Sequence, residues 1–352
     1  MVTILMLGPG RNMRGGISAV VNVYFDSELI DKYKITYITT HVDGSKAVKL
    51  FQFIKAFFRF SGLILKGEIG LVHIHSASRA SFYRKSLFAL FAKTFRKKIV
   101  FHIHGAEFKK FYFEKSGELK KRFIRYVLGQ ADRIIALSDE WKRILTDIVG
   151  RGDRICMIYN PVKVRDVIPS IRNSSLVSVL LMGRLEKRKG VFDLIDIAHK
   201  LKDSQRKVKL ILCGDGDVDK VMDEIRKKNL APFFEVPGWI TDKDKYYKQA
   251  DIYVLPSYAE GLPMSILEAA SYGLPIVATR VGGIPEIIDD GVNGFLIDPG
   301  DKGALTDRLL RLIENPELRS QMGRAAYQKV KDKFDVDTVV KQLDSLYQEF
   351  LN

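Results

Sequence analysis

The chain has 352 residues, which is long for a single hydrophobic core and predicts two domains. Its composition, 46% hydrophobic and 28% charged, is typical of a globular protein and excludes the disordered and fibrous classes. The net charge of +15 is concentrated in residues 1–165, which hold 30 Lys and Arg against 13 Asp and Glu, and this indicates an anionic partner for the first half.

The first half alternates strand-like and helical segments. It starts with a strand at residues 2–7, without a signal-peptide pattern, and no run of 18 apolar residues predicts a membrane span. A glycine-rich loop at residues 8–16 then leads into a helix near Ile17, a pattern typical of a phosphate cradle, although a plain strand-to-helix turn also explains it. The later expected strands are 34–40, 70–75, 98–104, 133–137 and 154–159, and the helices are 46–65, 79–95, 117–130 and 138–149.

Residues 162–175 lose this periodicity and predict a linker, after which the alternation resumes. The expected strands are 176–182, 208–213, 233–236, 251–255, 275–278 and 294–297. The expected helices are 191–202, 217–228, 242–249, 263–271 and 302–313, with two more after Pro316. Alternation of this kind predicts parallel sheets covered on both faces, so we expect two doubly wound α/β domains that bind ligands at the carboxyl ends of their strands.

Residues 257–273 form the most informative stretch of the chain. The sequence predicts Glu260 in a tight loop, Pro263 at the first helical position and Glu268 in the second helical turn. The free N–H groups of a helix N-terminus suit a phosphate, and the two flanking carboxylates can accept hydrogen bonds from hydroxyls. The alternative is a loop acid and a solvated helix Glu.

The loop after the strand at 176–182 carries Arg184 and Lys189, which could face one pyrophosphate or could be two solvated surface cations. Asp215 and Asp217 lie in a Gly-Asp-Gly-Asp turn, and we favour a plain turn over a metal site there. Cys156 and Cys213 lie in apolar runs and predict buried thiols in a reducing compartment.

Four histidines alternate along two expected strands, so His73 shares a face with His75, and His102 shares one with His104. A metal site is one interpretation, but no Cys or acid joins them, and we expect these rings to be satisfied by backbone groups. Only His104 lies at the carboxyl end of its strand, where ligands bind.

Basic and aromatic residues are interleaved in residues 46–125, and residues 79–125 alone carry 14 Lys and Arg against three Glu. Core packing explains most of the aromatic side chains but not the cations. We expect this region to rest on an anionic membrane surface. No recognised nucleic-acid-binding motif is present, so we expect no nucleic acid partner.

Several motifs together resemble the retaining glycosyltransferases of family 4, the group 1 transferases with the GT-B fold. The resemblance covers nearly the whole chain and is tightest across residues 176–300. Its motifs are Gly15-Gly16, His104, Gly183-Arg184 with Lys189-Gly190, Gly214-Asp215-Gly216, Glu260 with Glu268, and Val281-Gly282-Gly283 with Glu286.

The resemblance implies a GT-B fold, with two doubly wound Rossmann-like domains facing across a cleft. It implies that Arg184 and Lys189 hold the donor diphosphate, that Glu268 binds the ribose and that Glu260 contacts the donor sugar. The implied catalytic residues are His104, Glu260, Arg184 and Lys189. The implied donor-binding residues are Gly15, Gly16, Arg184, Lys189, Gly238, Trp239, Ile240, Glu260, Gly261, Leu262, Pro263 and Glu268. Family members need no metal, so neither a cofactor nor a metal site is expected.

We therefore expect a retaining, metal-independent hexosyltransferase that uses a nucleoside diphosphate sugar, UDP- or GDP-linked. The expected acceptor is a lipid-linked glycan of bacterial surface polysaccharide synthesis, and the expected location is the cytoplasmic face of the membrane. The alternatives are a nucleotide-sugar epimerase on the same fold, a transferase with a soluble acceptor, and a non-catalytic binding module. Residues 1–165 would bind the acceptor, residues 166–335 would bind the donor, and a helix at 336–352 would return to the first domain.

Overall fold

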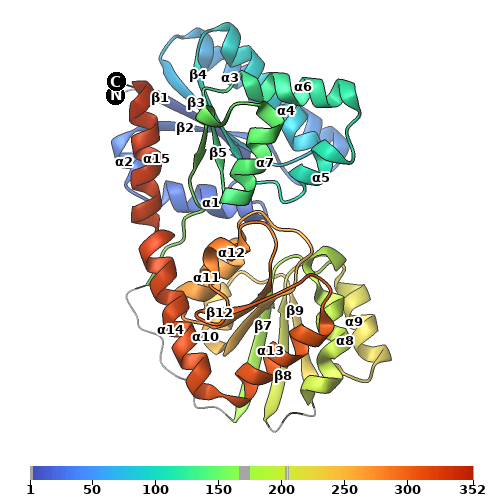
Figure 1. Cartoon of the computed structure of the whole chain (residues 1–352). Helices are drawn as coiled ribbons and strands as arrows, with labels where there is room; N and C mark the ends of the chain where they lie inside the picture. Colours follow the sequence, from blue (N-terminus) through green and yellow to red (C-terminus); the bar gives the residue numbers. More distant parts are fainter. Residues whose placement is uncertain (1–2, 166–174, 203, 205, 352) are drawn as a thin grey trace. The chain divides into compact units, whose positions relative to one another are not determined.

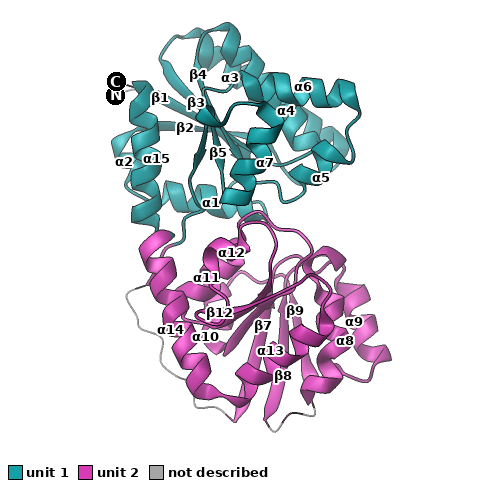
Figure 2. Ribbon diagram, in the orientation of Figure 1, with its two compact units in different colours: residues 1–162, 334–352 teal, residues 163–333 magenta. Residues whose placement is uncertain are grey.

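The computed structural model describes residues 3–165, 175–202, 204 and 206–351. Most of the expected linker, residues 166–174, lies outside the described residues. The chain divides into two compact units, of which unit 1 comprises residues 1–162 and 334–352 and unit 2 comprises residues 163–333 (Figure 2). The C-terminal helix therefore belongs to unit 1.

Unit 1 is built on a six-stranded parallel sheet with the strand order β2-β1-β3-β4-β5-β6 (Figure 1). Its strands are β1 Thr3–Pro9, β2 Lys34–His41, β3 Ile69–Ser76, β4 Lys98–Ile103, β5 Arg133–Ala136 and β6 Ile155–Met157. Its helices are α1 Gly16–Phe25, α2 Leu29–Lys32, α3 Lys46–Leu65, α4 Ala80–Thr94, α5 Phe108–Phe113, α6 Glu118–Gly129, α7 Asp139–Val149 and α15 Val336–Leu351.

Helices cover both faces of this sheet because its parallel strands need crossover connections. One hydrophobic core lies between the sheet and the helices α3, α4, α6 and α7, where the buried rings of Phe60 and Phe88 pack edge to face and Phe82 is also buried. On the opposite face, α1 packs on β1 and α15 packs on β3. The order of the strands reverses between β1 and β3, which makes that point the topological switch of unit 1.

Unit 2 repeats this architecture with the strand order β12-β11-β10-β7-β8-β9. Its strands are β7 Leu176–Met182, β8 Lys207–Cys213, β9 Phe234–Gly238, β10 Ile252–Leu255, β11 Ile276–Thr279 and β12 Gly294–Ile297. Its helices are α8 Val191–Lys202, α9 Val218–Lys227, α10 Lys243–Gln249, α11 Met264–Ser271, α12 Ile284–Ile287, α13 Lys302–Glu314 and α14 Pro316–Lys333. The strand order reverses between β7 and β10, so the loops that follow these two strands diverge there.

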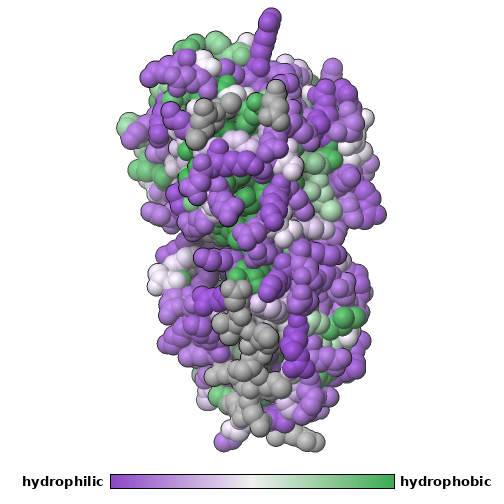
Figure 3. Space-filling model, turned by 90° about the vertical axis from the view of Figure 1, so that its left-hand side faces the viewer, coloured by the Kyte–Doolittle hydropathy of each residue, from purple (hydrophilic) through white to green (hydrophobic). Residues whose placement is uncertain are grey.

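The expected strands and helices are confirmed to within two residues at their ends, but the sequence did not predict the short helices α2, α5 and α12. The end of the first segment of unit 1 is hydrogen-bonded to the start of its second segment. Val162 N–H donates to the Phe334 carbonyl at 2.9 Å, and Val336 N–H donates to the Val162 carbonyl at 3.0 Å. Hydrophilic residues dominate the face shown in Figure 3. Among the described residues, no helix combines the length and the hydrophobicity needed to cross a membrane.

Candidate functional site

The candidate site of unit 2 lies at the carboxyl ends of β7 and β10, where the strand order reverses. Backbone and side-chain hydrogen bonds join the two loops that follow these strands. Tyr258 N–H donates to the Arg188 carbonyl at 2.8 Å, and the Arg188 guanidinium donates to the Ala259 carbonyl at 2.8 Å. The loops are thus held together at the point where doubly wound sheets bind their ligands.

A buried ion pair joins the same two loops. Lys189 Nζ lies 2.6 Å from Glu260 Oε1, with only 13% and 6% of the two side chains exposed, and Ser257 Oγ donates to the same oxygen at 2.7 Å. Glu260 holds the Lys189 cation in one position, because a short, charge-assisted hydrogen bond inside the protein is directional and strong. The structure therefore brings together two of the predicted site residues, which are 71 positions apart in the sequence.

Arg184 is placed differently from Lys189. Its side chain is 61% exposed, and its Nε lies 3.4 Å from Glu186 Oε2. Lys189 points instead toward Glu260 and passes close to the backbone of Gly183. A Cβ atom built on Gly183 would lie 3.8 Å from Lys189 Cε. One cation of the predicted pair is thus enclosed and the other is exposed.

Two glycines allow the loops at this edge to approach closely. Gly190 has φ +70°, and a Cβ there would lie 2.0 Å from the Pro256 carbonyl oxygen. At Gly214, φ is +153°, and a Cβ would lie 1.8 Å from the Gly183 oxygen. Neither position accepts a side chain, because both the backbone conformation and the space exclude one.

The segment that contains Asp215 and Asp217 forms a bridge to the loop after β7, with Gly216 paired to Leu185. Leu185 N–H donates to the Asp215 carbonyl at 2.6 Å, and Asp217 N–H donates to the Leu185 carbonyl at 2.8 Å. The segment thus pairs through its backbone with the loop after β7. Among the described residues, neither aspartate belongs to a group of three potential metal ligands.

Glu268 lies on α11 and has two partners on α10 that the sequence analysis missed. Lys243 Nζ lies 2.8 and 3.1 Å from its two carboxylate oxygens, and the Tyr247 hydroxyl donates at 2.7 Å. Burial, followed by the nearby Glu268 charge, raises the pKa of Tyr247 well above its usual value. Lys243 and Tyr247 are four residues apart, so they lie on one face of α10. This spacing was the one sequence feature that could have indicated that both contact the same partner.

The loop that contains Gly261, Leu262 and Pro263 leads directly into α11. Gly261 accepts a hydrogen bond from Gly283 N–H at 2.6 Å, which fixes this loop against the segment after β11. The prediction for Pro263 was wrong by one position, because its ψ of 119° makes it the N-cap residue and not the first helical residue. No side chain of the described residues caps α11, so its first N–H groups remain available to an anion.

The predicted donor-binding residues Gly238, Trp239 and Ile240 begin at the last residue of β9. The Gly238 carbonyl accepts a hydrogen bond from Gly214 N–H at 2.8 Å, which ties it to the neighbouring turn. Trp239 is 43% exposed, and Ile240 is partly buried. These residues therefore lie along the same edge of the sheet as Lys189 and Glu260.

The remaining predicted residues belong to unit 1. Gly15 precedes α1 with φ +143°, and no side chain of the described residues caps that helix. His104 follows β4, and its N–H donates to the Ser76 carbonyl at 2.8 Å. Its ring Nε2 lies 2.9 Å from His75 Nδ1, and burial first, then the charge of neighbouring groups, lowers the pKa of His104 to about 3.

Comparisons with known proteins follow the same division of the chain. The family described as "Glycosyl transferases group 1" matches residues 170–329, and the family described as "Glycosyltransferase Family 4" matches residues 26–166. An uncharacterized glycosyltransferase of Methanocaldococcus jannaschii is 27% identical over 328 residues, which are 92% of this chain and 88% of that protein.

Two further similarities have more specific names. The capsular polysaccharide biosynthesis glycosyltransferase CapM of Staphylococcus aureus is 24% identical over 253 residues, which are 66% of either chain. The crystal structure of Anabaena HepE in complex with UDP-glucose has a TM-score of 0.78 and 21% identity, and the match covers 99% of this chain and 100% of that one. At this identity, the structural match shows a common GT-B fold.

Proposed function

Since the chain belongs to the group 1 glycosyltransferases, we propose that it transfers a sugar from a nucleoside diphosphate sugar to a hydroxyl of a glycan acceptor, with retention of the anomeric configuration. The observation that carries this proposal is the Lys189–Glu260 pair at the switch point of unit 2. A fixed cation and a carboxylate at this point support contacts with a phosphate and with a sugar hydroxyl. The UDP-glucose bound to HepE supports a uridine nucleotide as donor.

The chemical barrier is cleavage of the bond between the anomeric carbon and the diphosphate oxygen. Lys189, Arg184 and the uncapped N-terminus of α11 stabilise the negative charge that develops on the departing diphosphate. Neither acid is assigned as a nucleophile, because Glu260 is engaged by Lys189 and Glu268 by Lys243. The acceptor hydroxyl forms the new bond to the anomeric carbon, and its proton passes to the leaving phosphate.

A thermal-stability panel of UDP-, GDP- and ADP-sugars, followed by transfer assays, tests this function. The matching donor should stabilise the protein by about 2.7 kcal/mol at a concentration of 100 times its Kd. Product should then form only when a glycan acceptor is added. Isomerisation of the donor sugar without an acceptor would indicate an epimerase, and no stabilisation by any nucleotide would contradict the proposal.

The two acids should give different kinetic phenotypes. Glu268→Ala should weaken nucleotide binding by about 10–100-fold, the effect of losing hydrogen bonds to a charged group, because ribose contacts persist in the ground and transition states. Glu260→Ala should mainly lower kcat. Tyr247→Phe, which removes one partner of Glu268 but keeps the aromatic ring, should reproduce the first effect more weakly. Reversed phenotypes in the two alanine variants would contradict the assignment of the acids.

Removal of divalent cations should not affect the reaction. We propose that protein cations and helix dipoles stabilise the diphosphate, so EDTA should change the initial rate by no more than about twofold. The measurement is the rate before and after chelation, with Mg²⁺ or Mn²⁺ added back. Strong inhibition that Mg²⁺ reverses would revive a metal site at Asp215 and Asp217.

We further propose that the acceptor is lipid-linked and that unit 1 docks on the anionic cytoplasmic surface of the membrane. Helix α3 supports this, because it exposes an apolar stripe on the side opposite its buried residues Ala56, Phe60 and Ile64. The stripe comprises Phe51, Ile54, Phe58 and Leu65, which are 69%, 43%, 73% and 64% exposed. Their spacing of three, four and seven places them on one side of the helix.

The charge of α3 favours the same partner. The helix contains four cations, Lys46, Lys49, Lys55 and Arg59, and no acidic residue. Lys55 and Arg59 lie along one edge of the stripe. An apolar stripe bordered by cations matches the chemistry of an anionic bilayer, where apolar side chains enter the interface and cations meet phosphate groups. The similarity to CapM, which is named for capsular polysaccharide biosynthesis, agrees with an acceptor of this kind.

A further inference from the structure

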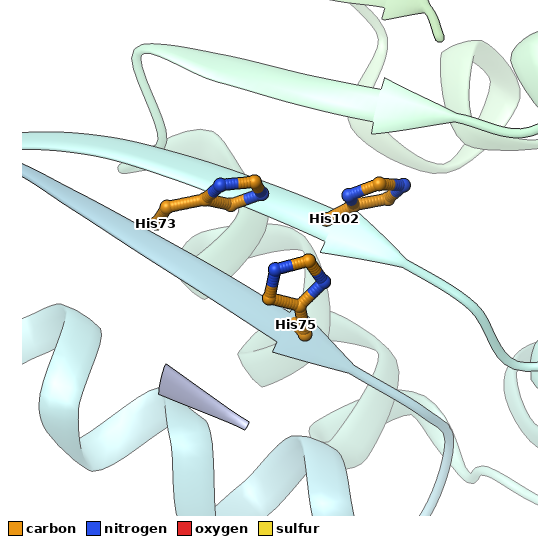
Figure 4. Close-up of side chains that lie close together, drawn as sticks. All are labelled: His73, His75 and His102. Carbon is orange, nitrogen blue, oxygen red and sulfur yellow. The ribbon is translucent and has the colours of Figure 1, made fainter. Parts of the chain in front are cut away.

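Four imidazole rings are stacked inside unit 1, on the face of the sheet that α1 and α15 cover. His73 and His75 lie on β3, His102 lies opposite His75 on β4, and His104 follows that strand. The ring centroids of neighbouring histidines are 4.0–5.5 Å apart. Figure 4 shows His73, His75 and His102 grouped on one side of the two strands, and all three are 0% exposed.

The expectation that backbone groups satisfy these rings was wrong. The ring bonds that the structure shows go to side chains, from His73 Nδ1 to the Tyr347 hydroxyl at 2.6 Å and between His75 Nδ1 and His104 Nε2 at 2.9 Å. Among the described residues, His73 Nε2, His75 Nε2 and both ring nitrogens of His102 have no hydrogen-bond partner. Leaving a buried polar group unpaired costs about 1–3 kcal/mol, so several such nitrogens in one place need an explanation.

We propose that His73, His75 and His102 bind a divalent metal ion of the zinc class. One ring nitrogen from each residue lies within 4.8 Å of the others. In a tetrahedral site with zinc–nitrogen bonds of 2.0–2.1 Å, the ligand nitrogens lie about 3.3 Å apart, so the three rings would have to turn out of their stacked arrangement and bring one nitrogen each toward a common centre. A set of imidazoles without carboxylates favours Zn²⁺ over Mg²⁺ or Ca²⁺.

The existing hydrogen bonds orient two of the rings for this role. When the Tyr347 hydroxyl accepts from His73 Nδ1–H, the lone pair of Nε2 is free to bind the metal. His104 does the same for His75 through its own Nε2. Outer partners of this kind fix the tautomer and the ring orientation of metal-binding histidines.

The proposed ion would have a structural role. It would cross-link β3 to β4, and through Tyr347 it would connect these strands to the C-terminal helix α15. All three proposed zinc ligands belong to unit 1. The zinc site is therefore separate from the donor site proposed in unit 2, and the zinc proposal does not depend on whether Mg²⁺ or Mn²⁺ binds at Asp215 and Asp217.

Zinc binding by the full-length, untagged protein tests the proposal. After removal of all metals, exposure to buffered Zn²⁺ and gel filtration, the wild type should retain about one zinc per chain by mass spectrometry. His73→Phe and His102→Phe, which keep a planar ring but remove a ligand, should each weaken binding at least about 100-fold, more than the loss of an outer partner costs. His199→Ala, a change at an exposed histidine of unit 2, should bind like the wild type.

Two further measurements keep the test decisive if a phenylalanine variant folds poorly. Tyr347→Phe retains every ligand and should weaken zinc binding by about 10–100-fold. Co²⁺ bound to the wild type should give the visible absorption of a tetrahedral nitrogen site. Wild-type protein that retains less than about a tenth of an equivalent of zinc would overturn the proposal, and so would unchanged zinc content in the folded His102→Phe variant.

Discussion

Lys189→Ala should lower kcat/KM by about 10²–10³-fold, the usual effect of losing one group that stabilises charge in the transition state. The same change should lower the free energy of unfolding by on the order of 3 kcal/mol, because it leaves the Glu260 carboxylate buried without its cation. Steady-state kinetics and urea unfolding measure the two effects separately.

Arg184→Ala provides the natural comparison. Its effect on kcat/KM should be similar, about 10²–10³-fold, whereas its stability should remain close to that of the wild type, because the side chain is 61% exposed. Lys187→Ala removes an exposed cation from the same loop and should leave both quantities unchanged. This control shows whether the loss of activity comes from the positions of Lys189 and Arg184 or from the removal of any positive charge in the loop.

A double variant separates catalysis from stability at Lys189. Lys189→Met combined with Glu260→Gln removes both charges and keeps the approximate size of the side chains, so it should recover most of the lost stability. Its activity should stay low, since neither the cation nor the carboxylate is restored. Turnover close to the wild type in both Lys189→Ala and Arg184→Ala would remove the assignment of these residues to the diphosphate.

The fold was predictable because its signals are local. Apolar runs such as 176–182 and 208–213, each followed by a glycine turn and an amphipathic segment, specify a strand and its crossover helix with little help from the rest of the chain. The missed helices α2, α5 and α12 contain only four to six residues, too few to show a helical period. Their conformations depend on the structure around them, and a propensity signal this short is weak.

The contacts of the site were harder to predict, because they join segments that are distant in the sequence. Residue type and motif spacing singled out Glu268, but its partners Lys243 and Tyr247 lie 25 and 21 residues earlier, on another helix. Tyr347 meets His73 across 274 positions, because α15 returns to unit 1. Such pairs depend on how helices pack on the sheet, which a single sequence does not specify.

Phe51→Ser combined with Phe58→Ser should reduce binding of the protein to anionic vesicles by at least about 100-fold. Each phenylalanine contributes about 1.5–3 kcal/mol when it leaves water for an apolar environment, and both are now mostly exposed. Lys55→Glu with Arg59→Glu should also weaken binding, since each surface cation near an anionic membrane contributes about 1 kcal/mol. Co-sedimentation with phosphatidylserine-containing vesicles measures both effects.

The apolar stripe and the cations of α3 make this helix a better test of the membrane proposal than the cluster of Lys93, Arg96, Lys97 and Lys98. Lys93 and Lys98 lie 3.9 and 3.5 Å from Asp132, so part of that charge is already offset within the fold. Charge reversal of the whole cluster should therefore release less protein from vesicles than its four cations suggest.

The matched control for the stripe is Val292→Ser, a change at an apolar residue of unit 2 that is 59% exposed, and it should bind vesicles like the wild type. Binding of the wild type should fall as salt rises, because attraction between surface charges decays over about 8 Å at physiological ionic strength. Donor binding should be unchanged in the α3 variants, since Lys189 and Glu260 belong to unit 2.

If the wild type binds neutral and anionic vesicles equally at low salt, the membrane proposal is wrong and a soluble acceptor becomes the better hypothesis. If the phenylalanine variants bind as tightly as the wild type, the docking surface lies elsewhere than on α3.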